Sequence, residues 1–384
     1  MTLPRHAELW LPGYLRSRSI AREEARARSG VVDILFAIVD HFEPLHGDAP
    51  HDVGARRVQA WADRYPPLAA AFHDADGRHP QHTFFYPVEQ YQPDLLEPLA
   101  ALCGRGFGEV EVHLHHDRDD AEHLRRLLRD FAAVLHERHG LLTRDASGAI
   151  RYAFIHGNWA LSNSLPDGAW CGVDDELAVL CDTGCYADMT LPAAPSAAQT
   201  TTVNQIYYAV GAPRGPRAHD RGVRARVGRS ASANDLLLVQ GPLLPSFRRA
   251  KFGIVPRLEN GALHAGHPPT LARFEEWLSC GICVKGRSEW VFVKVHTHGA
   301  PERNAEMMLG AETQAFHRDL LAAYNDGSRY RVHYVTAREM VNIIHAAEDG
   351  KTGNPGQYRD YRLPRPEPVG GARSMRPLDG KRGA

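Results

Sequence analysis

Four side chains of metal-binding type lie close together in the segment from 109 to 117, which reads EVEVHLHHD. Imidazole and carboxylate groups are common ligands of divalent metals, and imidazole is the usual acid–base group near neutral pH. A solvated, histidine-rich strand end is the structural alternative. Packing gives no reason for so many ligand-type residues in five positions, so we favour a metal-binding or catalytic role. The four residues are His113, His115, His116 and Asp117.

The same segment alternates in polarity at the period of a β-strand. Glu109, Glu111, His113 and His115 fall on one face, and the apolar residues between them fall on the other. The pattern predicts a strand with one buried apolar face and a group of ligands at its C-terminal end. On this pattern His115 points to the same side as His113, whereas His116 points away.

Ligand-type residues also end two other predicted strands. The strand at 290–295 alternates so that Lys294, His296 and His298 share one side, opposite three valines. The apolar strand at 31–40 ends in Asp40 and His41. Asp40 could cap the following segment through its carboxylate. Its place at the end of a buried strand favours a functional position.

A fourth strand, at 151–155, runs into His156, Asn158 and Trp159. An aromatic face and an amide group suit the wall of a sugar site, because one covers the ring and the other bonds hydroxyls. The alternatives are a hydrogen-bonded turn histidine and a tryptophan that only packs.

Strands and helices alternate along most of the chain, which predicts an α/β fold with a mainly parallel sheet. The C-terminal strand ends would then share one rim, where β/α barrels build their active sites. No GxGxxG follows a strand and no GxxxxGK[ST] loop occurs, so dinucleotide and P-loop phosphate binding lack support. The pattern predicts strands at 31–40, 83–86, 109–115, 151–155, 203–210, 235–240, 290–295 and 330–335, and helices at 20–28, 54–74, 94–103, 119–139, 174–180, 269–280, 303–324 and 337–347.

Composition divides the chain into three parts. Residues 1–30 form an N-terminal extension, and residues 31–349 form the main unit. Within it, the stretch from about 193 to 234 mixes Ala, Pro, Arg and Gly and is typical of an insertion or a loop over a site. Residues 350–384, rich in Gly, Pro and Arg, are expected to form a loosely ordered tail.

The 384 residues are 43% hydrophobic and 24% charged, which is typical of a globular protein with a sizeable core. A net charge of -1 favours neither nucleic acid nor an anionic membrane surface as a partner. The chain shows no signal peptide and no run near the roughly 18 apolar residues of a membrane span, so we expect a cytoplasmic protein with reduced thiols. The close cysteine pairs at 181/185 and 280/283 lack the matched spacing of a zinc knuckle.

In order and content, these segments resemble the polysaccharide deacetylases of carbohydrate esterase family 4, within the glycoside hydrolase/deacetylase superfamily. AIVDHFEP at 37–44 matches the first motif, HLHHD at 113–117 the second, and VFVKVHTHG at 291–299 the last. FIHGNW at 154–159 stands in the place of the third motif, and ELAVLCDTGCYADMT at 176–190 in that of the fourth. The resemblance covers about residues 31–300.

The resemblance implies a distorted (β/α)7 barrel and metal-dependent removal of an acyl group from an amino sugar or polysaccharide. In the family, the aspartate of the first motif is the general base, and Asp40 holds that position here. The last motif supplies the general acid, for which His296 and His298 are the candidates. The substrate-binding wall implied by the third and fourth motifs comprises His156, Asn158, Trp159, Tyr186 and Asp188.

The implied cofactor is a divalent metal ion, and zinc is the metal we expect. His41, His113 and Asp117 would hold it, with His115 as a reserve ligand. The sequence departs from the family pattern here, because His41 stands where the family has a metal-binding Asp and Asp117 where it has a second His. The third motif also lacks its Arg.

Two other functions remain open on the sequence. The same barrel could carry a glycosidase whose paired carboxylates are Asp40 and either Asp188 or Glu43, at a separation that depends on the stereochemical course. A non-catalytic carbohydrate-binding protein of polysaccharide biosynthesis is the alternative from another class.

Overall fold

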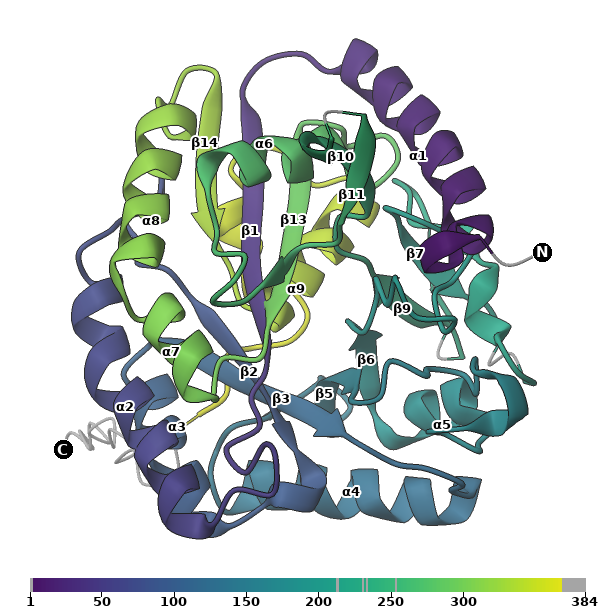
Figure 1. The fold of residues 1–384 in the computed structure, drawn as a ribbon, viewed down its shortest axis with the longest axis vertical. Coiled ribbons are helices and arrows are strands. Elements are labelled where there is room, and N and C mark those ends of the chain that lie inside the picture. Colours follow the sequence, from purple (N-terminus) through teal and green to yellow (C-terminus); the bar gives the residue numbers. More distant parts are fainter. Residues whose placement is uncertain (1–2, 212–213, 230, 233, 253, 368–384) are drawn as a thin grey trace, which may run out of the picture.

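A computed structural model describes residues 3–211, 214–229, 231–232, 234–252 and 254–367 (Figure 1). A large, mostly parallel sheet forms its centre, with the strand order β12-β13-β1-β2-β3-β5-β6-β9-β7-β8. The predicted α/β class with a mainly parallel sheet is therefore confirmed. The hydrogen-bonded path ends at β12 and at β8, and no pairing among the described strands joins these ends. The predicted (β/α)7 barrel is not confirmed.

The main sheet contains the strands that carry the candidate site residues and a set of peripheral strands, and a hairpin lies outside this sheet. The site-bearing strands and their neighbour are β1 (Val32–His41), β2 (His82–Pro87), β3 (Gly108–Leu114), β5 (Ile150–His156) and β13 (Trp290–Thr297). The others in the main sheet are β4 (Thr143–Arg144), β6 (Cys185–Asp188), β7 (Ile206–Ala209), β8 (Val223–Arg224), β9 (Leu236–Val239), β12 (Ala262–Leu263) and β14 (Tyr330–Tyr334). The hairpin consists of β10 (Leu244–Lys251) and β11 (Val255–Glu259).

Helices cover the sheet, with α2, α3, α4 and α8 around the outside of the view in Figure 1 and α9 behind its central strands. None of the described helices is both long and apolar enough to cross a membrane. The α-helices are α1 (Ala7–Ala27), α2 (His51–Ala69), α3 (Pro93–Gly104), α4 (Ala121–Glu137), α5 (Glu176–Thr183), α6 (Leu271–Ser279), α7 (Glu302–Met308), α8 (Ala311–Tyr324) and α9 (Ala337–Glu348). Short 3-10 turns lie at Pro4–His6, Val88–Gln90, Pro166–Gly168, Ala218–Asp220 and Pro355–Tyr358.

Alternate residues of the strands enter two different cores. On β1, Ile34 and Phe36 belong to the core shared with the outer helices, whereas Leu35 and Ala37 belong to the core that includes Met340 of α9. We call these the outer and inner faces of the sheet. The valines at 110 and 112 and at 291, 293 and 295 lie on the outer face, as the alternation predicted. The ligand-type residues between them therefore belong to the inner face.

β1 is placed by three neighbours, which fixes the position of the strand end that carries His41. It pairs with β13 from Asp33 to Asp40. On its other edge, β14 pairs with its first half and β2 with its second half, up to His41. The C-terminal half of β1 therefore lies between β13 and β2 at the rim of the sheet.

Several elements differ from the sequence prediction. The helix expected at 303–324 is divided into α7 and α8, because Gly310 adopts an extended backbone that interrupts the helix. The turn-rich segment at 181–190 contains a buried strand, β6, and the β10–β11 hairpin was not predicted. In the expected insertion, Arg217 donates to the carbonyl oxygens of Ser164, Ala197 and Gln199, which fastens the segment to its surroundings.

The described part of the C-terminal segment packs against α9. The Asn342 side chain bonds the backbone of Arg359 and Leu363, and Leu363 is buried. The tail expected at 350–384 is thus attached up to at least Leu363, and its residues 368–384 lie outside the described residues.

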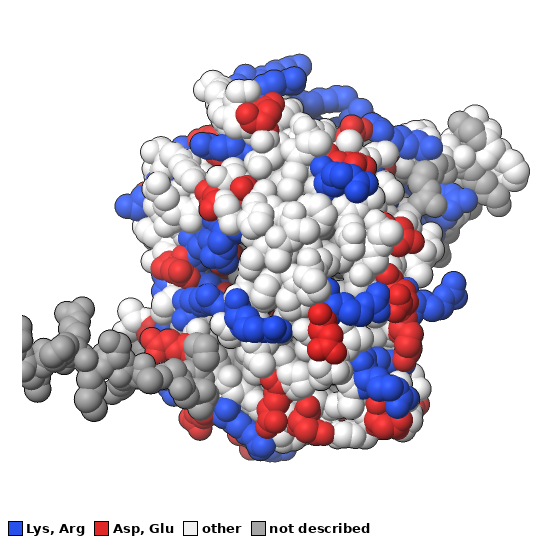
Figure 2. All heavy atoms as spheres, turned by 90° about the vertical axis from the view of Figure 1, so that its left-hand side faces the viewer, with Lys and Arg blue, Asp and Glu red and all other residues white. Residues whose placement is uncertain are grey.

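The face formed by α2, α7 and α8 carries basic and acidic side chains intermixed (Figure 2). Ion pairs Arg57–Glu302 and Arg64–Glu306 join α2 to α7 there. Intermixed charges produce no extended field of one sign, so this face offers no surface for a polyanion.

Candidate metal centre

One carboxylate and several imidazoles meet at the C-terminal ends of β1, β3 and β13. The Oε1 atom of Glu43 lies 3.3 Å from Nε2 of His113, 3.4 Å from Nδ1 of His298 and 3.6 Å from Nε2 of His115. His41 belongs to the same group, with a ring nitrogen within 4.8 Å of ligand atoms of Glu43 and His298. We call these five residues the Glu43 group.

The separations in the Glu43 group suit a shared ion. A tetrahedral zinc ion with bonds of 2.0–2.1 Å to N and O ligands separates neighbouring ligand atoms by roughly 3.3–3.4 Å. Glu43, His113 and His115 have ligand atoms within 4.8 Å of one another. The group can therefore hold a metal ion after only small side-chain adjustments.

The hydrogen bonding of His113 gives independent support for a cation. Its Nδ1 lies 3.0 Å from the carbonyl oxygen of Ile155, which only accepts, so Nδ1 carries the proton. Burial lowers the pKa of His113, although Glu43 opposes that shift, so the ring is neutral near pH 7. The lone pair of Nε2 then faces the Glu43 carboxylate, an arrangement that is repulsive unless a cation lies between them.

His115 is oriented in the manner of a metal ligand. Its Nδ1 lies 2.5 Å from Oε1 of Glu89, so it donates to that carboxylate and leaves Nε2 for the Glu43 group. Burial opposes protonation, but the hydrogen bond and charge of Glu89 raise the pKa of His115 above its usual value. Carboxylate–histidine–metal arrangements fix the ring and strengthen it as a ligand. Gly157 permits this position, since a Cβ atom there would lie 2.4 Å from the His115 ring.

Glu43 is the central residue of the group and is 3% exposed. Burial opposes its ionisation, but the close contacts with His113 and His298 hold its pKa well below the usual range, so it is an anion. Its second oxygen, Oε2, lies 2.6 Å from Nδ1 of His46. The sequence indicates Glu43 only as one of the paired carboxylates of a glycosidase. Continuing the strand alternation two residues past His41 would have placed it on the inner face.

An aromatic wall stands beside the Glu43 group. Trp159 stacks on His41 with ring centroids 4.7 Å apart and contacts His296 edge-on at 5.1 Å. Nδ1 of His41 is buried and has no hydrogen-bond partner among the described residues. Burial, reinforced by neighbouring basic groups, lowers the pKa of both His41 and His296 well below the usual value, so both rings are neutral.

The structure does not bring Asp40 to this group. Its carboxylate lies on the outer face of β1, fully buried, where it accepts a hydrogen bond from the Gly299 backbone at 2.6 Å. The other oxygen lies 2.8 Å from Nε2 of His82. Because successive strand residues point to opposite faces, His41 and Asp40 cannot enter one site. Asp40 instead positions the turn that follows His298.

Asp117, Tyr186 and Asp188 also lie apart from the Glu43 group. Asp117 is exposed and accepts from the Trp170 backbone at 2.5 Å. Tyr186 bonds Glu111 within the inner core, and Asp188 accepts a 2.7 Å hydrogen bond from the Thr190 hydroxyl. Of the predicted site residues, the structure gathers His41, His113, His115, His296, His298 and Trp159.

His156 belongs to a second buried group on the outer face, with His116, Cys171 and Glu176. We call it the Glu176 group. Oε1 of Glu176 lies 3.1 Å from Nε2 of His116 and 3.6 Å from Nε2 of His156, and Oε2 lies 3.5 Å from the Cys171 sulfur. Asn158 bonds the backbone of His116 and so helps to fix this turn. The prediction that His116 points away from His113 and His115 is confirmed.

The Glu176 group is held together by a protonated histidine. Burial opposes protonation of His116, but Asp119 and Glu176 raise its pKa to about 9, so it is an imidazolium near pH 7. The Nδ1 atom of His156 accepts from the Asn158 backbone at 3.2 Å, so its proton lies on Nε2. Neither ring offers a free lone pair to the carboxylate side. Although its atoms are close enough for a metal, this group is better described as an ion pair with a hydrogen-bonded neighbour.

Comparisons with known proteins add no family to this description. A scan against protein-family models finds no match for the chain, and a search of curated proteins finds none either. The deacetylase resemblance of the motifs thus remains a prediction, and the geometry of the Glu43 group is the basis for a functional proposal.

Proposed function

We propose that this protein is a metal-dependent hydrolase that removes an acyl group from a carbohydrate, on a β/α barrel of the deacetylase type. Three of the four side chains Glu43, His113, His115 and His298 would hold the metal, which leaves one coordination position for water. The observation that carries the proposal is the fixed tautomer of His113, whose buried lone pair faces an ionised carboxylate at 3.3 Å. Zinc is the metal that best suits a set of three imidazoles and one carboxylate.

The residues around the ligands have separate roles. A divalent metal bound here would polarise an acyl carbonyl and lower the pKa of a bound water. The neutral, buried ring of His41 would accept the proton of the attacking water, and the imidazolium formed in this way would return that proton to the leaving group. His296, a neutral ring on the same inner face, would position the leaving group through a hydrogen bond. Trp159, which stacks on His41 through one face, would offer its other face to a sugar ring. Asp40 acts only as a positioning residue in this scheme, through its hydrogen bond to the Gly299 backbone.

The geometry favours this reaction over hydrolysis by paired carboxylates. Asp40 and Asp188 are 0% and 1% exposed, and protein groups occupy their oxygens. Glu43 is surrounded by imidazole nitrogens. None of the three has the open face that a glycosidic oxygen or an anomeric carbon would need.

Metal analysis of the purified full chain, combined with an acetate-release assay, tests the proposal. We expect about one equivalent of metal, which a strong chelator removes and Zn²⁺ or Co²⁺ restores. N-acetylated chitin oligosaccharides serve as the first substrate probes. Acetate release should disappear with the metal and return with it.

A variant separates catalysis from binding. His41→Gln should retain the metal but lower kcat by about 10²–10⁴-fold, the usual contribution of a general base. Metal content that is absent, or activity indifferent to chelation, would remove the metal mechanism. Stoichiometric metal with oligosaccharide binding but no acetate release would instead identify a carbohydrate-binding protein.

A further inference from the structure

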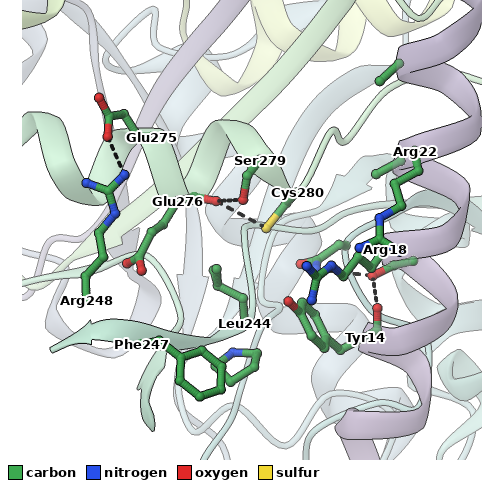
Figure 3. A pocket seen from close by; sticks show the side chains of 15 residues that line it. Tyr14, Arg18, Arg22, Leu244, Phe247, Arg248, Glu275, Glu276, Ser279 and Cys280 are labelled. Carbon is green, nitrogen blue, oxygen red and sulfur yellow. Dashed lines mark hydrogen bonds and ion pairs between the residues drawn. The ribbon is translucent and has the colours of Figure 1, made fainter. Parts of the chain in front are cut away.

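Two surface cavities lie near the β10–β11 hairpin, and they differ in charge. One, of about 450 Å³, lies between α1, β10 and α6 (Figure 3). The other, of about 370 Å³, lies between β11, the segment 260–267 and the N-terminal turn at Arg5. Both are in the size range of small-molecule sites.

The cavity of Figure 3 has basic and acidic walls. Arg18 and Arg22 extend into it from α1, and Glu275 and Glu276 line it from α6. Arg248 pairs with Glu275 at 2.6 Å. With both signs present, this cavity does not select an anion.

The second cavity, which we call the Arg257 pocket, is basic. Arg5, Arg257, His264 and His267 line it, and Glu259 is its acidic residue. Glu259 is buried and neutralised, because both of its oxygens accept from the Arg273 guanidinium at 2.9 Å. In the described part of the chain, neither Arg5 nor Arg257 forms an ion pair. The pocket thus presents uncompensated positive charge.

The sheet places this pocket beside the Glu43 group. β12 pairs in parallel with β13, with Leu263 opposite Thr297. The next residues are His264, which lines the pocket, and His298, which contacts Glu43. Adjacent strands lie about 4.8 Å apart. Asn304 joins the two segments, since it accepts from the Ala265 backbone at 3.0 Å and donates to the His298 carbonyl at 2.9 Å.

The segment that carries His264 and His267 is held rigidly. The buried Arg273 donates to the carbonyl oxygens of Ala262 at 2.7 Å, His267 at 2.6 Å and Pro268 at 2.9 Å. These hydrogen bonds are made in addition to its two bonds with Glu259. A segment fixed in this way keeps this wall of the pocket in place before a ligand arrives, which lowers the entropic cost of binding.

We propose that the Arg257 pocket binds a carboxylate or phosphate group carried by the substrate of the neighbouring Glu43 group. The substrate is then an acylated acidic sugar, whose anionic group lies on Arg257 and Arg5 while its acyl group reaches the metal ligands. This assignment of the substrate rests on the proposed function. Anion binding by the pocket itself does not require the metal.

Calorimetric titration of the metal-free full chain tests the pocket. Inorganic phosphate and D-glucuronate are the two probes, and the metal is left out so that neither can bind to it. We expect both to bind, and Arg257→Gln to weaken binding by about tenfold or more, because a charge-assisted hydrogen bond is lost. Arg18→Gln is the matched control, since it removes the same charge from the other cavity and should change nothing.

The outcomes separate the two proposals. Failure of both anions to bind, or equal binding to Arg257→Gln and the unaltered chain, overturns the pocket proposal and leaves the metal analysis untouched. Equal weakening by Arg18→Gln also overturns it, because only net charge would then matter. With Zn²⁺ restored, Arg257→Gln should raise KM for an acetylated, uronate-containing oligosaccharide and leave KM for a neutral chitin oligosaccharide unchanged.

Discussion

The Glu43 and Glu176 groups both place imidazoles around a buried glutamate, yet their hydrogen bonds give them opposite character. In the Glu43 group, Nδ1 of His113 donates to Ile155 and Nδ1 of His115 donates to Glu89, so Nε2 of each ring faces Glu43, and that of the neutral His113 presents a lone pair. In the Glu176 group, the Asn158 backbone occupies the lone pair of His156, and His116 lies between two carboxylates as a cation. The first group needs a cation, whereas the second already contains one.

A third grouping extends the comparison. His333 lies 2.9 Å from Asp33 through Nε2 and 2.8 Å from Asp76 through Nδ1, so both of its nitrogens donate. Its ring offers no lone pair to a metal, although its atoms, like those of the other two groups, are close enough for one. The proximity of ligand-type residues therefore does not identify a metal site. The direction of each ring proton does.

The strongest test of the comparison is Glu43→Gln. Removal of the anion at the centre of three imidazoles should weaken metal binding by more than about 100-fold, since changes to second-shell partners alone cost 10–100-fold. Competition with a chromogenic chelator measures the affinity, and the absorption of bound Co²⁺ reports the ligand set. His123→Ala, at a half-exposed histidine of α4, should leave both unchanged. Unaltered affinity in Glu43→Gln would place the metal elsewhere.

Glu176→Gln should have the complementary effect, on stability and not on metal content. It removes one of two carboxylates beside the buried His116 cation. Removing one partner of a buried ion pair typically costs 3–5 kcal/mol, and the remaining Asp119 should reduce this to about 2–3 kcal/mol of unfolding free energy. Urea denaturation measures the loss, and NMR titration should show the pKa of His116 falling from about 9. Loss of metal in Glu176→Gln with stability unchanged would reverse the assignment of the two groups.

The sequence predicts those site residues that lie on an alternating strand or directly after it. His113 on β3 and His115 just after it, like His296 on β13 and His298 just after it, follow directly from the period of two. The same period of two places Asp40 on the face opposite His41. The prediction nevertheless assigns both residues to one site, because Asp40 matches a position of the first family motif. Asp117 follows the end of β3, where the period of two no longer holds, and Arg118 after it has a positive φ of 50°.

The rest of the fold depends on contacts that no local pattern contains. β1 pairs with β13, β14 and β2, three partners that lie between 40 and 300 residues further along the chain. The short strands β6 and β7 lack enough residues for a clear alternation, and β7 enters the sheet antiparallel to β9. Nor does the sequence indicate that α9 covers the inner face, because its polar residues Arg338 and Asn342 are buried too, through bonds with Glu109 and the C-terminal segment that only the tertiary fold creates.

The smallest expected effect concerns the charge of His333, and it appears as a pH dependence of stability. Burial opposes protonation, but Asp33 and Asp76 raise the pKa of His333 above the usual value of about 6.5. The folded chain therefore holds this proton more tightly than the unfolded chain. The resulting stabilisation is complete below about pH 6.5 and is lost as the pH rises through the folded-state pKa, by at most about 1.4 kcal/mol for each unit of pKa difference.

Urea denaturation between pH 6 and pH 9 measures this dependence in the unaltered chain, in His333→Gln and in Asp76→Asn. The raised pKa of His116 also makes the stability fall as the pH rises. The contribution of His333 is therefore obtained from the difference in pH dependence between the chains. His333→Gln should remove its share of the decline, and Asp76→Asn should reduce that share because one of the two carboxylates remains charged. Identical slopes in all three chains would mean that His333 is neutral when folded. Its ring would then have a lone pair, and the contrast with the Glu43 group would no longer hold.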